Sequence, residues 1–216
     1  MKNLLYKEFK LAVHPTTYIF LALCAMMLIP SYPGYAEFMY VCLSIFFVFL
    51  AGRENKDVFY TVLLPVRKRD VVKARCLMIA IIELVQIGLS VPFAILSNRI
   101  SPDHGNMAGI DLNVAFFGFV FGFLSVFNIV FFPIFYRTAQ KVGLALAFGG
   151  TAILLYYALV EMLVWIPSPI STFLDTNSTD MMVKHLPILL AGILIWIFTW
   201  ILTYRRSATN FEKVDI

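Results

Sequence analysis

Long apolar runs set the limits on what this chain can fold into. Six stretches approach or reach the roughly 20 helical residues that cross a hydrocarbon core of about 30 Å. They are residues 16–29, 36–51, 76–96, 112–135, 142–165 and 186–204. Only 14% of the 216 residues are charged, whereas soluble domains carry roughly a quarter. The sequence therefore predicts an all-α integral membrane protein, with six transmembrane helices in a single domain over residues 1–216.

The placement of Lys and Arg predicts the orientation of these helices, because cytoplasmic loops are enriched in basic residues. With six spans, both chain ends lie on the same side. Of the 17 Lys and Arg residues, only Arg99 and Lys184 fall on the opposite side. We therefore expect both termini in the cytoplasm. The apolar run 16–29 is the weakest of the six predicted spans. Without it the number of spans would be odd, and the basic residues would no longer gather on one side of the membrane. This favours the existence of span 16–29.

Several common classes of function find no support in the residues. The formal charge of +4 follows the membrane topology and gives no reason to expect nucleic acid. The three cysteines lack the paired spacing of a disulfide framework. Asp103, His104 and Asp111 share a loop but fit no metal geometry, so no metal is expected. No GxxxxGK(S/T) phosphate loop occurs, so any dependence on ATP must come from a partner.

Residues 1–14 carry apolar side chains near helical spacing, interleaved with Lys and Glu. This pattern predicts an amphipathic helix that lies on membrane lipid at the cytoplasmic interface, before the first span. The alternative is a basic leader that only fixes the topology.

The loop over residues 52–75 is the longest on the cytoplasmic side, and part of it has one apolar helical face. That face consists of Val58, Phe59, Val62 and Leu63. Pro65 then ends the helix. We expect a short helix between the second and third spans, whose apolar face is buried against either the bilayer surface or a partner protein.

The run from Glu54 to Arg75 resembles the first cytoplasmic loop of type 2 ABC transporter permeases. The shared pattern is Leu-Pro-Val, a basic pair, an acidic residue, two aliphatic residues and a Lys, although Arg67 stands where Ser is more usual. Residues 1–10 are similar to the interfacial helix of that family, and the six-span plan agrees. The size of the chain resembles the small permeases of bacterial peptide-toxin and antimicrobial-peptide exporters.

This resemblance implies a permease subunit, not itself an enzyme, of an ATP-driven exporter in the bacterial cytoplasmic membrane. Two permeases, identical or paralogous, would pair with two separate ATPase subunits that bind the ATP and Mg. The cargo would be amphipathic peptides, toxins or other hydrophobic molecules. The short loop helix would dock on the ATPase as a coupling helix, with apolar side chains at the centre of the contact and polar ones at its rim. The coupling residues would be Glu54, Asp57, Val58, Phe59, Val62, Leu63 and Leu64.

Four polar residues inside the spans are candidates for a substrate pathway or a helix seam: Glu83, Gln86, Asn128 and Glu161. An ionised side chain at mid-membrane costs on the order of 2.5–3.5 kcal/mol, so such groups face protein or a wet cavity. The alternative for Glu83 is a protonated side chain hydrogen-bonded to a neighbouring helix. Glu161 lies near the outer interface, where we expect it to reach water. Gly118 and Gly122, four residues apart, predict a close helix approach.

Two other functions remain as alternatives to a permease driven by an ATPase. An intramembrane protease needs paired Glu and converging His on the spans, whereas His14, His104 and His185 fall at span ends or in loops. An ATPase-independent carrier usually shows more intramembrane charge or an inverted repeat. The second of these alternatives also includes a membrane scaffold. If the loop helix binds an ATPase, the chain is a permease; if the helix only lies on lipid, a carrier or scaffold is favoured.

Overall fold

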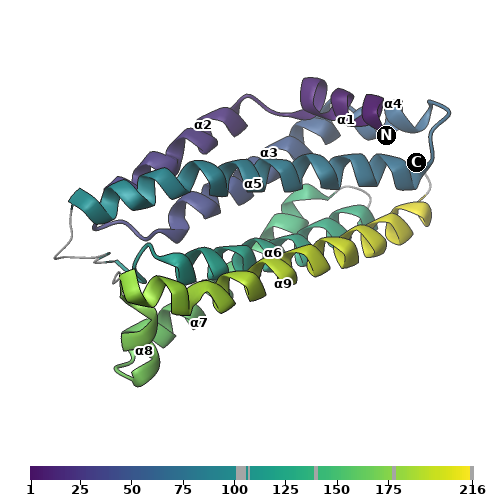
Figure 1. The fold of residues 1–216 in the computed structure, drawn as a ribbon. Helices are drawn as coiled ribbons and strands as arrows, with labels where there is room; N and C mark the ends of the chain where they lie inside the picture. Colours follow the sequence, from purple (N-terminus) through teal and green to yellow (C-terminus); the bar gives the residue numbers. More distant parts are fainter. Residues whose placement is uncertain (101–105, 107, 139–140, 177–178, 215–216) are drawn as a thin grey trace.

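The computed structural model describes residues 1–216 except 101–105, 107, 139–140, 177–178 and 215–216 (Figure 1). The regular elements of the described residues are all helices. This confirms the predicted all-α class.

Within the described residues, five helices are long and apolar enough to cross a membrane. They are α3 (Tyr35–Glu54), α5 (Lys68–Ile100), α6 (Val114–Arg137), α7 (Val142–Trp165) and α9 (Thr179–Glu212). Each contains one predicted span almost entirely, and the predicted bounds 142–165 coincide with α7. Helices α5 and α9 extend well beyond the apolar runs that predicted them, because polar residues continue the helix outside the hydrocarbon.

The N-terminal segment has a broken helical path. Helix α1 (Lys2–Lys7) continues into the π-helical η1 (Glu8–Ala12), and after an 85° bend the chain enters α2 (Thr16–Ala22) and the 3₁₀-helical η2 (Leu23–Leu28). Seven α-helical and six 3₁₀ residues rise about 22 Å, less than the roughly 30 Å core. The described residues therefore contain five helices that could span a membrane, or six spans if this bent pair counts as one.

Helix α6 forms the centre of the bundle. In its most apolar stretch 72% of the residues are buried, against 22% in α7 and α9. Its buried face is a column of aromatic side chains that pack on Phe49 of α3 and Trp200 of α9. The outer faces of α5, α7 and α9 instead expose Leu and Ile. This distribution suits a bundle whose surrounding solvent is lipid.

Two glycines of α6 allow the close helix approach that their spacing predicts. A side-chain carbon at Gly192 of α9 would overlap the backbone of Gly118, and one at Gly118 would meet the backbone of Ile188. At Gly122 the space is filled by Tyr156 of α7, whose hydroxyl donates to the Phe119 carbonyl oxygen (3.0 Å). Small residues therefore hold α9 and α7 against α6.

Both chain ends lie at one end of the bundle, together with α1 and the short helix α4 (Asp57–Val62) (Figure 1). We call this the terminus end. The short helix α8 (Pro169–Leu174) lies at the opposite end.

Candidate functional site

Helix α4 presents apolar side chains to the surroundings at the terminus end. It follows Lys56, whose positive φ of 52° turns the chain sharply after α3. Phe59 and Leu63 are 43% and 68% exposed, and Tyr60 and Leu64 are exposed beside them. We call the exposed face of α4 the surface formed by Phe59 and Tyr60 of this helix and by Leu63 and Leu64 directly after it.

The remaining predicted coupling residues lie around this face. Val58 is only 6% exposed and packs into the core of the bundle. Glu54 is exposed at the end of α3. Val62 lies in α4, but its side chain is outside what the structure describes. The apolar side chains of α4 thus divide between an inner contact at Val58 and an outer face.

The inner side of α4 is held by a charge network of Lys7, Glu8, Asp57 and Arg75. The Asp57 carboxylate pairs with both Lys7 and Arg75, and Arg75 also pairs with Glu8. Lys7 completes the network with an ion pair to Glu8 (3.2 Å) and a hydrogen bond to the Thr61 hydroxyl (2.7 Å). Two cations and two anions thereby join the N-terminal segment, α4 and α5.

Most of this network is shielded from solvent. Arg75 and Glu8 are 3% and 1% exposed, and the Arg75 guanidinium lies over the Phe49 ring, 5.5 Å from its centroid. Burial acts to raise the pKa of Asp57, but the charges of Arg75 and Lys7 outweigh it and hold that pKa below its usual value. Asp57 is therefore engaged within the chain. The sequence reasoning missed Lys7, Glu8 and Arg75 as its partners.

A second set of contacts fastens the chain just after α4. Arg69 donates two parallel hydrogen bonds to the Glu212 carboxylate (2.6 and 2.8 Å). Lys68 donates to the Val214 carbonyl oxygen (2.9 Å) and lies over the Phe211 ring. The start of α5 is thus attached to the C-terminal end of α9, which supports α4 from its other flank.

Within the bundle, Glu83 of α5 accepts hydrogen bonds from two other helices. Asn128 of α6 donates its side-chain amide to Oε1 (2.8 Å). The indole nitrogens of Trp196 and Trp200 in α9 donate to Oε2 (2.9 and 3.2 Å). Glu83 and Asn128 are fully buried. Two of the four predicted intramembrane residues therefore meet, and the tryptophans that complete the cluster were not predicted.

Gln86 belongs to a neighbouring cluster on the same face of α5. Its side chain lies beside the carboxyl of Glu37 in α3. The Ser90 hydroxyl lies within hydrogen-bond distance of Glu37 Oε1 (2.5 Å) and of the Gln86 backbone oxygen (2.8 Å). Glu37 was missed because it falls at the edge of the predicted span 36–51. Glu83 was singled out because an ionised side chain inside a span is costly, and the same argument applies to Glu37, which is also a carboxyl in an apolar helix.

Glu161 lies apart from these clusters, near the end of α7. It is buried against Gly109, where any side-chain carbon would overlap its carboxylate. The expectation that Glu161 reaches water is therefore wrong, because the chain around Gly109 covers it.

Among the described residues, no group of three or more His, Cys, Asp or Glu could hold a metal ion. Asp103 and His104 of the acidic loop fall outside those residues. Cys24, Cys42 and Cys76 are free and buried.

In a comparison with known protein families, residues 3–207 match the family described as ABC-2 family transporter protein. No curated protein and no solved structure matches the chain. The family match spans the N-terminal segment, α4, the buried clusters and nearly all of α9.

Proposed function

The chain belongs to the ABC-2 transporter family and is a multi-pass integral membrane protein, and from this premise we propose that it is the permease subunit of an ATP-driven exporter. The family is a membrane component of transport that generally works with an ABC ATPase. In this proposal ATP and Mg bind to that partner, and this chain supplies the membrane path.

The proposed topology has six spans, with the bent N-terminal pair counted as one and the terminus end in the cytoplasm. The distribution of basic residues supports this orientation. The segments at the terminus end contain Lys7, Lys68, Arg75 and Arg205. At the other end of the bundle, Arg99 lies near the end of α5 and Lys184 near the start of α9. This orientation places α4 on the side where ATP is available.

The single observation that carries the proposal is the exposed face of α4. Phe59, Leu63 and Leu64 are exposed, and so are the charged residues Glu54 and Lys56 that precede α4 in the chain. Apolar side chains surrounded by a polar rim are the composition of a protein contact. The charge network beneath fixes α4 to α5 and to the N-terminal segment, so a push on α4 would be passed to the spans. We assign the ATPase contact to this face, with Val58 and Asp57 holding the helix from within.

The packing of the bundle supports a complex of two permeases and two ATPases. Fully buried phenylalanines of α6, among them Phe123, Phe127 and Phe131, fill the centre of the chain. A path for cargo is then more easily built between two copies, identical or paralogous, than through one. The resemblance in size to small permeases of peptide exporters favours amphipathic peptides, toxins or other hydrophobic molecules as the cargo of a bacterial exporter.

The test is co-purification in detergent with the ABC ATPase encoded beside this chain. A Phe59→Asp, Leu63→Asp double variant should lose at least about tenfold of the bound ATPase, because two charges replace apolar contacts at the centre of the interface. The control is Ile170→Asp, Thr172→Asp, which places two charges on exposed positions of α8 at the other end of the bundle. The control should retain the ATPase.

A different result would favour an alternative function. If the wild type and both variants purify without any ATPase, and the chain stays folded, a carrier or scaffold that works alone becomes the better description. If the double variant keeps the ATPase, the docking surface is not the exposed face of α4.

A further inference from the structure

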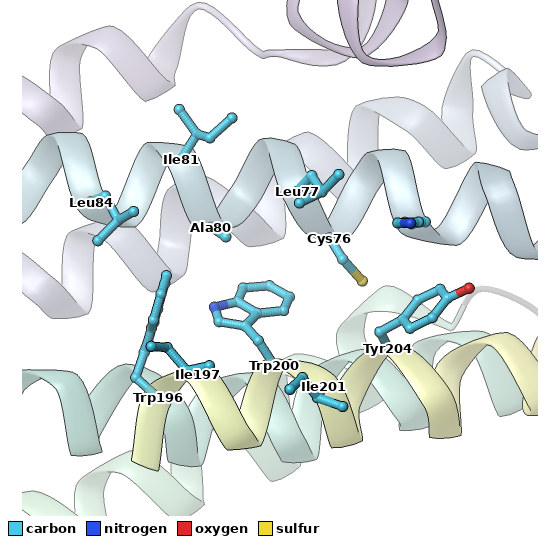
Figure 2. Close-up of a pocket in the computed structure, with 11 residues that line it drawn as sticks. Cys76, Leu77, Ala80, Ile81, Leu84, Trp196, Ile197, Trp200, Ile201 and Tyr204 are labelled. Atoms are coloured by element: carbon cyan, nitrogen blue, oxygen red, sulfur yellow. The ribbon is translucent and has the colours of Figure 1, made fainter. Parts of the chain in front are cut away.

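A groove of about 390 Å³ runs between α5 and α9 on the outer surface of the bundle (Figure 2). Its sides are apolar and include Leu77, Ile81 and Leu84 from α5 and Ile197 and Ile201 from α9. These five side chains are exposed. In a membrane protein, such a groove opens toward the acyl chains of lipid.

The mouth of the groove at the terminus end has a different chemistry. Lys73 and Tyr204 line it there, and Lys73 is the only charged lining residue. Arg205 and Arg206 follow Tyr204 on α9 and are exposed. In the described part of the chain, no acidic side chain forms an ion pair with Lys73, Arg205 or Arg206, whereas nearby Arg69 is paired with Glu212. The mouth therefore carries the unpaired charge of Lys73. Arg205 and Arg206 lie next to it along α9, where they line a separate surface hollow with Pro133 of α6.

The length of the groove indicates what fits in it. Lys73 and Leu84 are eleven residues apart on α5, which corresponds to about 16 Å of helix. This is about half of the roughly 30 Å hydrocarbon core. Lys73 precedes the apolar part of α5 by one turn, so the groove extends from headgroup level to about the middle of the bilayer. A transmembrane helix of a second copy would need a contact surface along the full thickness of the hydrocarbon core, whereas a lipid acyl chain occupies one leaflet.

We propose that this groove binds one acyl chain of an anionic phospholipid from the leaflet at the terminus end. The lipid phosphate pairs with the Lys73 ammonium group and accepts a hydrogen bond from the Tyr204 hydroxyl. Basic pockets between transmembrane helices select anionic headgroups in this way. Arg205 and Arg206 strengthen the preference for a net negative headgroup. This inference depends on the chain lying in a membrane and not on its pairing with an ATPase.

The bound chain would contact the tryptophans that hold Glu83. Trp196 and Trp200 line the groove (Figure 2). Their indole nitrogens donate to the Glu83 carboxylate. A lipid in the groove thus packs on both helices that meet at Glu83, and its occupancy holds α5 and α9 together.

The two groove tryptophans also supply the measurement. The chain has three Trp residues, and the third, Trp165, is exposed at the end of α7. In a Trp165→Phe background, all Trp fluorescence comes from Trp196 and Trp200. We would titrate this protein in mixed micelles with dibrominated phosphatidylglycerol and, separately, with dibrominated phosphatidylcholine of the same chains. Bromine quenches an indole only at contact.

Phosphatidylglycerol should quench at about a tenfold lower mole fraction than phosphatidylcholine, the difference expected from a charge-assisted contact. Lys73→Gln should remove this preference, whereas Lys184→Gln, an exposed lysine near the other end of α9, should keep it. Ala80→Leu, which fills the groove, should weaken quenching by both lipids, and Ala147→Leu on α7 should not.

Two results would overturn the proposal. Equal quenching by both lipids that Lys73→Gln leaves unchanged would mean ordinary, unselective lipid contact. Disulfide-linked dimers of Leu77→Cys in membranes, together with weak quenching by either lipid, would mean that a second copy covers the groove. Lys73 is exposed, so its variant should fold even if Ala80→Leu does not, and it tests the headgroup preference without Ala80→Leu.

Discussion

Arg75, at the start of α5, pairs with Glu8 of the N-terminal segment, and neither side chain is exposed to solvent. Because Arg75 also binds Asp57, one guanidinium fixes both the N-terminal segment and α4 to the same span. A buried charge that loses its partner is costly, so this arrangement makes the position of α4 depend on residues far from it in the sequence.

Arg75→Met should strongly destabilise the protein, because it leaves Glu8 buried without its principal partner. We expect a loss of about 3–5 kcal/mol in the free energy of unfolding, measured by denaturant unfolding in detergent. The control is Arg69→Met, which removes an exposed pair with Glu212 and should change stability little. Equal effects of the two variants would contradict the central role of Arg75.

The contribution of Asp57 to the stability of the folded protein should depend on pH. The pKa of Asp57 in the folded protein is lowered from its usual 3.8, so its contribution to stability is fully present above about pH 4 and is lost as the pH falls through the lower folded-state pKa. The wild type should therefore be more stable than Asp57→Asn at pH 6, and the difference should shrink below pH 4. A difference that stays constant between pH 6 and pH 3 would show that Asp57 is not ionised in the network.

Glu83→Leu should destabilise the bundle more than Trp200→Phe, which removes only one of the hydrogen-bond donors to Glu83. The variant leaves the Asn128 amide and the indole nitrogens of Trp196 and Trp200 buried without an acceptor, each at a cost of about 1–3 kcal/mol. Trp200→Phe removes one donor and keeps the ring contact. Thermal melting in detergent would compare them, and a Glu83→Leu protein as stable as the wild type would rule out a stabilising role for the cluster.

Gly192→Ala should push α9 away from α6. The added methyl group meets the backbone of Gly118, which cannot rotate away, so we expect a loss of about 1–3 kcal/mol. Gly150→Ala on α7 is the matched control, because a methyl group there meets nothing and alanine favours the helix. Thermal melting of both variants gives the comparison, and equal stability would mean that the helices can separate freely.

The proposed orientation can be tested by labelling with a membrane-impermeant thiol reagent. Lys184→Cys should react from outside intact spheroplasts, whereas Lys141→Cys should react only after the membrane is permeabilised. Both positions are exposed, and the native cysteines are buried. The reverse pattern would invert the topology and remove α4 from the side of the ATPase.

The sequence by itself determined the all-helical class, the approximate positions of the five long helices and the short helix before Pro65. These features depend on local properties, since a run of apolar residues long enough to cross lipid, or a proline that ends a helix, acts without regard to the rest of the chain. The same property located Glu83 and Asn128 as costly polar groups in apolar helices.

Only the tertiary structure decided which side chains meet. The contacts of Glu83 with Trp196 and Trp200, of Glu37 with Ser90, and the network around Arg75 join segments far apart in the sequence. Helices that are apolar on nearly every face give no periodic signal for which face turns inward, because lipid accepts apolar side chains as readily as the core does. Close packing at Gly118 and Gly192, and the pairing of buried charges, set those rotations and thereby created the clusters and the groove.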